Sequence, residues 1–213
     1  KNFNVKTDFV SVNNEKETGK CIVTLNENGV PSYNVLTDVA YDYIKAPDNV
    51  YELQFDVFCF GTLALRSKEN LKTVKSILKD SQIKKVYCDI NIRPPFFSDE
   101  TILFALENAN ILKISDEELS YVTNACGLKE LQDIAEKYNN LEFILLTQGE
   151  KGATVFDCKN KKTYTENAPK IEVASTVGAG DSFGATFICE YFNTNNIKKS
   201  LNKATEISAF VVS

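Results

Sequence analysis

DVFCFGTLALRSKENLKTVKSILKDSQIKKVYCDIN, residues 56–91, contains a strand, a helix and a second strand in this order. Both ends are rich in β-branched and aromatic residues, which predicts buried strands. Between them, Leu71, Val74 and Ile77 follow the spacing of one helix face, and Ser67 stands where a helix N-cap is expected. Strands that are joined through a helix pair in parallel, so this stretch predicts an α/β fold.

The alternation of strands and helices continues from this unit to the end of the chain. The sequence predicts strands at 110–115 and 142–149, helices at 99–109, 116–126 and 128–138, a hairpin at 152–167, and two helices that begin at about Ala179 and Ile197. This order predicts a parallel sheet with helices on both faces, and ligands bind outside the carboxyl ends of such strands.

The amino-terminal part does not follow this alternation. DFVSV (8–12) and KCIVTL (20–25) predict strands, and NENG (26–29) predicts the turn after the second of them. We therefore expect about residues 8–45 to form a small separate β-sheet that acts as a lid, and about residues 50–213 to form the α/β core.

The composition narrows the class of protein. The 213 residues are 43% hydrophobic and 25% charged, with a formal net charge of −5 and no basic stripe, which argues against nucleic acid as a partner. No run of about eighteen apolar residues is present, so we expect no membrane span. The six scattered cysteines form no C-x-x-C pair and predict buried thiols in a reduced compartment. Because no leader opens the chain either, we expect a cytoplasmic protein.

A glycine-rich turn lies in STVGAGDSFGATF, residues 175–187, and opens a predicted helix. The amide groups of Ala179, Gly180 and Asp181 are therefore available to an anion. The glycine spacing is one residue wider than in the G-x-G-x-x-G dinucleotide motif, and the G-x-x-x-x-G-K-[ST] phosphate motif is absent. Asp181 has two interpretations: a carboxylate that favours the helix start, or a base beside a transferring phosphoryl group. Because the chain has no histidine, acid–base chemistry must use Asp, Glu, Lys or Tyr.

This turn and four further stretches resemble, in the same order, the ribokinase-like sugar kinases, known as the PfkB family, and among them the fructokinases. The other stretches are FGTLALRS (60–67), DINIRPPFF (89–97), LKISDEEL (112–119) and TQGEKGATVF (147–156). The resemblance implies a single PfkB-type kinase domain over residues 1–213, folded as a three-layer α/β sandwich with a mostly parallel central sheet and a small β-sheet lid. The family's first strand, its Gly-Gly region and its last segment have no counterpart here, so we expect the chain to lack both ends.

The resemblance implies ATP-dependent phosphorylation of a primary hydroxyl of a small sugar, with fructose as the first candidate acceptor. Ribose, 2-keto-3-deoxygluconate or a nucleoside are alternative acceptors, and a non-catalytic protein that binds a sugar or a nucleotide is the alternative to an enzyme. ATP and Mg²⁺ are the implied cofactors. The resemblance leaves room for K⁺ beside the anion hole and for a homodimer formed through the lid.

The resemblance also assigns roles to individual residues. It makes Asp181 the catalytic base, with the backbone of Gly178, Ala179 and Gly180 as the anion hole. It implies that the nucleotide contacts a second set of residues, namely Lys113, Thr147, Gly149, Gly152 and Asn202. For the two glycines of TQGEKGA, a turn into the following hairpin is the alternative interpretation.

Two more polar sites follow predicted strands. Asn91 and Arg93 leave the end of a strand on one side, where Arg93 could stabilise the phosphoryl group or fix the loop before two prolines. Ser115 and Glu118 stand where the family often has Asn-x-x-Glu, which is linked to magnesium and phosphate. The same two residues have the spacing of a capping box, which needs no ligand, whereas Glu118 could instead hold water around Mg²⁺.

Overall fold

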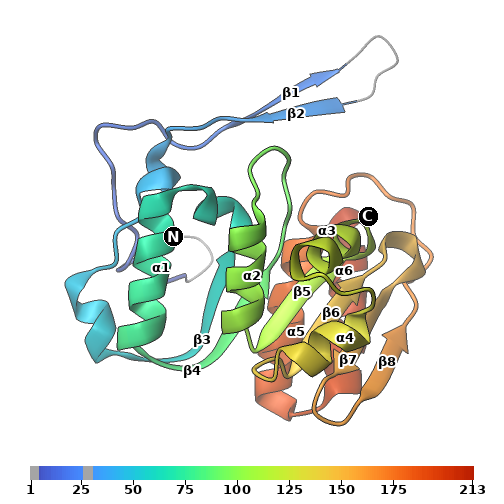
Figure 1. Ribbon diagram of the computed structural model, residues 1–213. Coiled ribbons are helices and arrows are strands. Elements are labelled where there is room, and N and C mark those ends of the chain that lie inside the picture. The colour runs from blue at the N-terminus through green and yellow to red at the C-terminus, as the bar shows by residue number, and fades with distance from the viewer. Residues whose placement is uncertain (1–4, 26–30) are drawn as a thin grey trace. The chain divides into compact units, whose positions relative to one another are not determined.

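The computed structural model describes residues 5–25 and 31–213 (Figure 1). The turn that we predict at NENG (26–29) lies outside these residues. The chain forms two compact units. One comprises the described residues up to Asp56 together with Ala64–Lys84, and the other comprises Val57–Leu63 together with Lys85–Ser213. Within the described ranges, no helix is both long enough and apolar enough to span a membrane.

The first unit contains the small sheet and one long helix. Its elements in chain order are β1 (Cys21–Leu25), β2 (Pro31–Val35), η1 (Ala40–Tyr43), η2 (Asp48–Glu52) and α1 (Lys68–Asp80). The two strands are antiparallel, and Ser67 caps α1 as the sequence predicts. Inside the unit, the buried guanidinium of Arg66 donates from Nε and Nη2 to the carboxylate of Asp42, at 2.8 and 3.0 Å.

The strand that we predict at residues 8–12 is wrong. The segment begins with a turn in which the amide of Val10 donates to the carbonyl of Thr7 at 3.0 Å, and the rest is irregular. Val10 and Val12 are 68% and 81% exposed, so this apolar run buries little surface on either face. β-propensity depends on such burial, and without it the local pattern does not produce a strand.

The second sheet has six strands in the order β3–β4–β5–β6–β7–β8. The strands are β3 (Gln54–Gly61), β4 (Gln82–Asp89), β5 (Ile111–Ser115), β6 (Phe143–Thr147), β7 (Ala153–Asp157) and β8 (Lys162–Glu166). The pairs β4–β5 and β5–β6 are parallel, as the strand–helix alternation predicts. The predicted hairpin supplies β7 and β8, which pair antiparallel with β6 and with each other, so the sheet is mixed.

Helices cover both faces of this sheet in the second unit (Figure 1). One face carries α2 (Asp99–Asn108), α3 (Asp116–Cys126) and α4 (Leu131–Lys137), and the other carries α5 (Ala179–Thr194) and α6 (Ile197–Val212). The side chains of β5 alternate between the two: Leu112 and Ile114 pack with the first group, and Ile111 packs with the second. The unit is therefore a three-layer α/β sandwich, as predicted.

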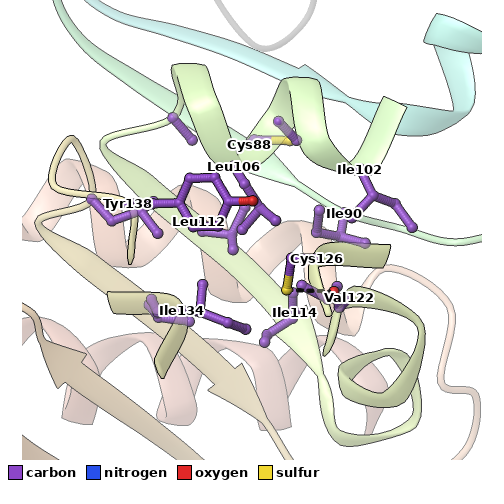
Figure 2. Packing of buried hydrophobic residues seen from close by; sticks show 14 of the residues in the cluster. Cys88, Ile90, Ile102, Leu106, Leu112, Ile114, Val122, Cys126, Ile134 and Tyr138 are labelled. Carbon is purple, nitrogen blue, oxygen red and sulfur yellow. Dashed lines mark hydrogen bonds between the residues drawn. The ribbon is translucent and has the colours of Figure 1, made fainter. Parts of the chain in front are cut away.

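The first of the two cores lies under α2, α3 and α4. Figure 2 shows strand residues such as Leu112 and Ile114 packed against Ile102 of α2, Val122 of α3 and Ile134 of α4. The thiol of Cys126 is buried here and donates to the carbonyl of Val122 at 3.0 Å. Cys88 is buried in the same core, as we predict for the cysteines in apolar runs, but Cys21, Cys59 and Cys189 are exposed.

The second core lies under α5 and α6 and depends on a close approach at Gly184. A Cβ atom on Gly184 would overlap the hydroxyl of the buried Tyr87 and would lie 2.9 Å from its ring carbon Cζ. Tyr87 comes from β4, so this glycine lets the helix sit directly on the strand. Burial raises the pKa of Tyr87 well above its usual range, because the phenolate would have to form away from water.

We expect Gly184→Ala to destabilise the protein by about 1–3 kcal/mol, because the added methyl overpacks a filled site. In a Tyr87→Phe background the same substitution should cost less, because the overlapping oxygen is gone while the contact at Cζ remains. Urea denaturation of the two single variants and the double variant measures this coupling. Equal costs of Gly184→Ala in both backgrounds would show that Tyr87 is not the group it meets.

Candidate active site

The predicted glycine-rich turn forms the amino end of α5. Gly178 is the N-cap and has φ +85°, a left-handed conformation that glycine adopts without strain. Its carbonyl accepts from the amide of Ser182 at 2.9 Å, which begins the helix. The amide of Ala179 is 3.4 Å from the carbonyl of Thr176. In the first helical turn the amides of Gly180 and Asp181 have no intrahelical acceptor, so they can bind an anion.

A buried ion pair lies beside this turn. Asp89 ends β4 and is the register partner of Lys113 on β5. The Lys113 ammonium donates to both carboxylate oxygens of Asp89, at 2.9 and 2.8 Å. A Cβ atom on Gly180 would lie 3.0 Å from this ammonium, so the lysine ends at the first turn of α5. The structure therefore brings a cation to the glycine-rich turn.

The electrostatics of Asp89 connect three carboxylates at this edge of the sheet. Burial raises the pKa of Asp89, the Lys113 ammonium lowers it, and the negative charges of Glu118 and Asp181 raise it further. The net direction is upward, because removing a carboxylate from water disfavours its charged form. Asp181 itself is exposed. The charge of the exposed Asp181 is thus felt by Asp89 in the buried ion pair.

Sequence reasoning missed Asp89, although it is the first residue of the quoted stretch DINIRPPFF. The available signal was that an acid ends one predicted strand and a lysine lies in the second half of the next predicted strand of a parallel sheet. The carboxyl ends of such strands meet at one edge, where sites form.

Ser115 and Glu118 form the capping box that their spacing predicts. The Glu118 amide donates to the Ser115 hydroxyl at 3.3 Å, and the Ser115 amide donates to the Glu118 carboxylate at 2.9 Å. The other carboxylate oxygen of Glu118 accepts from the amide of Ile92 at 2.7 Å. Glu118, which is buried, therefore fastens the loop after β4 to the start of α3.

The residues at this edge fit Mg²⁺ only through water. Both oxygens of Glu118 already accept one amide each, although a carboxylate oxygen keeps capacity for a second donor. In the part of the chain that the structure describes, no group of three or more His, Cys, Asp or Glu side chains could hold a metal ion by itself. Mg²⁺ keeps several waters and is commonly held by few carboxylates together with substrate phosphates, which is compatible with this arrangement.

We expect Glu118→Gln to destabilise the protein by about 1.5–3 kcal/mol, because two charge-assisted hydrogen bonds to backbone amides are weakened or lost. The matched control is Glu117→Gln, an exposed neighbour on the same helix turn, which should change stability by less than about 0.5 kcal/mol. Urea denaturation of both variants checks this. If Glu118→Gln lowers the free energy of unfolding as little as Glu117→Gln does, the bonds to Ile92 and Ser115 contribute nothing to stability.

Asn91 and Arg93 lie in the loop that Glu118 fastens. Ile90 and Ile92 are buried, whereas Asn91 is half-buried with φ +45° and Arg93 is exposed. The Arg93 guanidinium donates from Nη1 to the carbonyl of Ile92 at 3.0 Å. This contact agrees with a role of Arg93 in fixing the loop before the two prolines. The guanidinium keeps further N–H donors for a ligand.

The glycines of TQGEKGA form a tight turn after β6. Thr147 ends that strand as the register partner of Ser115, so it lies at the same carboxyl edge. Gly149 and Gly152 have φ +56° and +101°. A Cβ on Gly152 would overlap the carbonyl of Glu166, so the turn itself requires glycine there. The turn into the hairpin accounts for Gly152 without a ligand.

Asn202 lies on the exposed side of α6, away from the turn of α5. Two residues of α6 reach this turn: the Ser208 hydroxyl donates to the carbonyl of Ala179 at 3.0 Å, and the Val211 side chain would lie 3.5 Å from a Cβ on Gly178. Asn202 is six residues before Ser208, about 9 Å along the helix axis. Sequence reasoning missed Ser208. Its signal was the short connection between the two predicted helices, which brings the end of the second beside the start of the first.

These features together place an anion-binding helix start, an exposed acid and a buried ion pair at the carboxyl edge of an α/β sheet. Residues 1–213 match the pfkB family carbohydrate kinases over the whole chain, and the protein belongs to this family.

Individual relatives are more distant. A probable fructokinase-4 from Arabidopsis thaliana is 24% identical over 221 residues, which cover 95% of this chain and 65% of the relative. The chain thus spans about two thirds of the length of the curated relatives that it matches.

Solved structures show the same fold. A fructokinase with bound ATP from Xylella fastidiosa superposes with a TM-score of 0.81 at 16% identity, covering 94% of this chain and 69% of that one. A nucleoside kinase from Methanocaldococcus jannaschii, an archaeal member of the ribokinase family, gives 0.72 at 22% identity, covering 93% and 62%. The fold is therefore the ribokinase-like α/β fold, as the sequence predicts.

Proposed function

We propose that this protein is an ATP-dependent sugar kinase that phosphorylates a primary hydroxyl, with fructose as the first candidate acceptor and fructose 6-phosphate as the product. The observation that carries the proposal is the start of α5. Its first turn holds the exposed carboxylate of Asp181 and two amides without helical acceptors, and the buried ammonium of Lys113 lies beside it. Phosphoryl transfer needs these parts together, because the acceptor must lose a proton while negative charge is neutralised nearby. Membership of the pfkB family and the fructokinase-named relative support it.

In the proposed reaction, Asp181 accepts the proton of the acceptor hydroxyl. The hydroxyl oxygen forms a bond to the γ-phosphorus of ATP, the bond from that phosphorus to the β-phosphate oxygen breaks, and ADP leaves. The backbone of Gly178, Ala179 and Gly180 holds the transferring group, and the Lys113 ammonium offsets its charge. Mg²⁺ bound to the phosphates would supply further charge neutralisation, with Glu118 holding it through water.

The remaining assignments follow the same scheme. Asn91 and Arg93 contact the phosphoryl group from the loop after β4, and Thr147, Gly149, Gly152 and Asn202 are the candidate nucleotide contacts. We further propose that residues 1–213 belong to one kinase domain in which about residues 8–45 act as the lid over the acceptor, and that this lid can pair two subunits. We also propose a cytoplasmic location, because the proposed reaction consumes ATP.

The acceptor is the least constrained part of the proposal. The nucleoside kinase with the same fold favours a nucleoside as the second candidate, followed by ribose and 2-keto-3-deoxygluconate. A non-catalytic protein that binds a sugar or nucleotide is the candidate from another class. The exposed carboxylate beside the anion-binding turn argues against such a protein, because its charge would repel a bound phosphate.

The test is release of ADP by the full-length protein with ATP, Mg²⁺ and a panel of fructose, ribose, 2-keto-3-deoxygluconate and adenosine. We expect turnover with fructose that exceeds the release without acceptor, and each measurement with and without K⁺ reports dependence on that ion. Turnover with another acceptor would correct the substrate and keep the reaction. ATP binding without turnover on any acceptor would contradict the kinase and support the binding protein.

A further inference from the structure

Lys113 is a buried cation with two carboxylates in its neighbourhood. Its side chain is 7% exposed and that of its partner Asp89 is 17% exposed. In β5, Leu112 and Ile114 point into the core shown in Figure 2, so the alternation of the strand turns Lys113 to the opposite face, toward α5. A buried ammonium must be paired, because an unpaired charge away from water is strongly disfavoured.

The second carboxylate is that of Asp181. The Lys113 ammonium lies where a Cβ on Gly180 would be 3.0 Å away, and Asp181 is the next residue. Asp181 also acts on Asp89, since its charge contributes to the raised pKa of that carboxyl. The lysine stem is flexible and carries a compact charge. Without Asp89, this flexible stem could carry the ammonium toward Asp181, the residue that follows Gly180.

We propose that Asp89 is a positioning residue that holds Lys113 away from Asp181, so that the acid of the α5 turn stays unpaired and able to take a proton. This inference rests on the proposed function of Asp181. The bidentate contact from Lys113 to both oxygens of Asp89 occupies two of the three ammonium donors and fixes the direction of the side chain. The positive charge still lies beside the amides that receive the phosphoryl group.

The pairing of Lys113 with Asp89 meets two opposed requirements at this turn, namely positive charge for the phosphoryl group and a base without a cation partner. A phosphoryl-transfer site needs positive charge, but a lysine that pairs with the base makes it a weaker base. The charge of Asp181 acts on Tyr87 and Asp89 of β4, and Glu118 of α3 also acts on Asp89. The Lys113 ammonium of β5 lies beside Gly180, the residue before Asp181. On α6, Ser208 reaches the turn and carries no charge. Lys113 is therefore the cation in this set that Asp89 must control.

The experiment compares wild type, Asp89→Asn and the double variant Asp89→Asn/Lys113→Met across pH. In Asp89→Asn, we expect kcat to fall about tenfold or more and the acidic limb of its pH profile to move to lower pH by about one unit or more, since a new cation favours the ionised acid. Removing the cation in the double variant should return the limb to its wild-type position. Asp89→Glu, which keeps the partner, should also leave the limb in place.

A second readout does not depend on turnover. Carbon-13 NMR of labelled Asp side chains follows the titration of Asp181, whose signal is assigned by its loss in Asp181→Asn. The midpoint should move down in Asp89→Asn and back in the double variant. A midpoint that stays fixed in Asp89→Asn, or one that stays low in the double variant, would overturn the inference. If Asp89→Asn does not fold, Asp89→Glu decides instead, because a midpoint that moves down by a unit or more although the partner is kept would overturn the inference. Absence of turnover in wild type would overturn the proposed function instead, and the NMR result would still decide the pairing.

Discussion

Replacing Asp181 with Asn should lower kcat for sugar phosphorylation by about 10²–10³-fold. Asn has nearly the shape of Asp but cannot accept a proton from the acceptor hydroxyl at neutral pH. Asp181 is exposed, so the substitution leaves no buried group without a partner, and the fold should persist. The measurement is ADP release with the best acceptor, together with circular dichroism and urea denaturation of the same sample.

The matched control is Asp99→Asn, because Asp99 is also an exposed acid in the first turn of a helix, α2. Both substitutions remove a carboxylate that favours a helix start, an effect of up to about 1 kcal/mol on stability. Asp99→Asn should therefore match Asp181→Asn in stability and keep wild-type turnover. If Asp181→Asn also keeps near-normal turnover, Asp181 only favours the helix start and the base assignment is wrong.

Phe187→Ala should destabilise the protein by about 3–5 kcal/mol. Phe187 is fully buried on α5, with its ring stacked 6.1 Å from that of Tyr191 and edge-on at 6.3 Å to that of Phe143. Truncation leaves a cavity between the helix and the sheet, because neighbours packed against backbone elements collapse only partly. Guanidinium denaturation followed by tyrosine fluorescence and by circular dichroism measures the loss.

The control is Phe210→Ala on α6, where the side chain is 76% exposed. That substitution should change stability by less than about 0.5 kcal/mol, because little surface is removed from contact. A cost below about 1 kcal/mol for Phe187→Ala would show that the core under α5 and α6 is not tightly packed. Packing of α5 on the sheet would then not be what holds the glycine-rich turn in its position.

The sequence predicts the layers well because the signals are local. Ser67 and Ser115 each stand at the N-cap that their position before an apolar periodic run predicts. The hairpin after β6 is also predicted, but its place in the sheet is not, because a hairpin pattern does not say which edge it joins. The strand expected at residues 8–12 fails for a related reason, since burial and pairing decide whether a β-prone run becomes a strand.

The residues of the candidate site also fall into a group that local sequence predicts and a group that only tertiary structure brings together. Gly178, Gly180 and Asp181 are found from sequence because a turn and the helix that it opens are contiguous. Asp89 and Lys113 are 24 residues apart and become partners only through the register of β4 and β5. The reach of Glu118 to the amide of Ile92 likewise depends on how α3 sits after β5. Contacts of this kind follow from tertiary structure, which periodicity and motif spacing do not encode.

Phosphorus-31 NMR of the full-length protein with ATP, Mg²⁺ and fructose identifies where the phosphoryl group goes, and so tests phosphorylation of the sugar itself. We expect loss of the γ-phosphate signal of ATP, growth of the ADP signals and a new phosphomonoester signal that matches fructose 6-phosphate. All three changes should be suppressed in Asp181→Asn. ADP signals accompanied by inorganic phosphate and by no phosphomonoester signal, or an unchanged ATP spectrum with every acceptor of the panel, would contradict transfer to a sugar hydroxyl at this site.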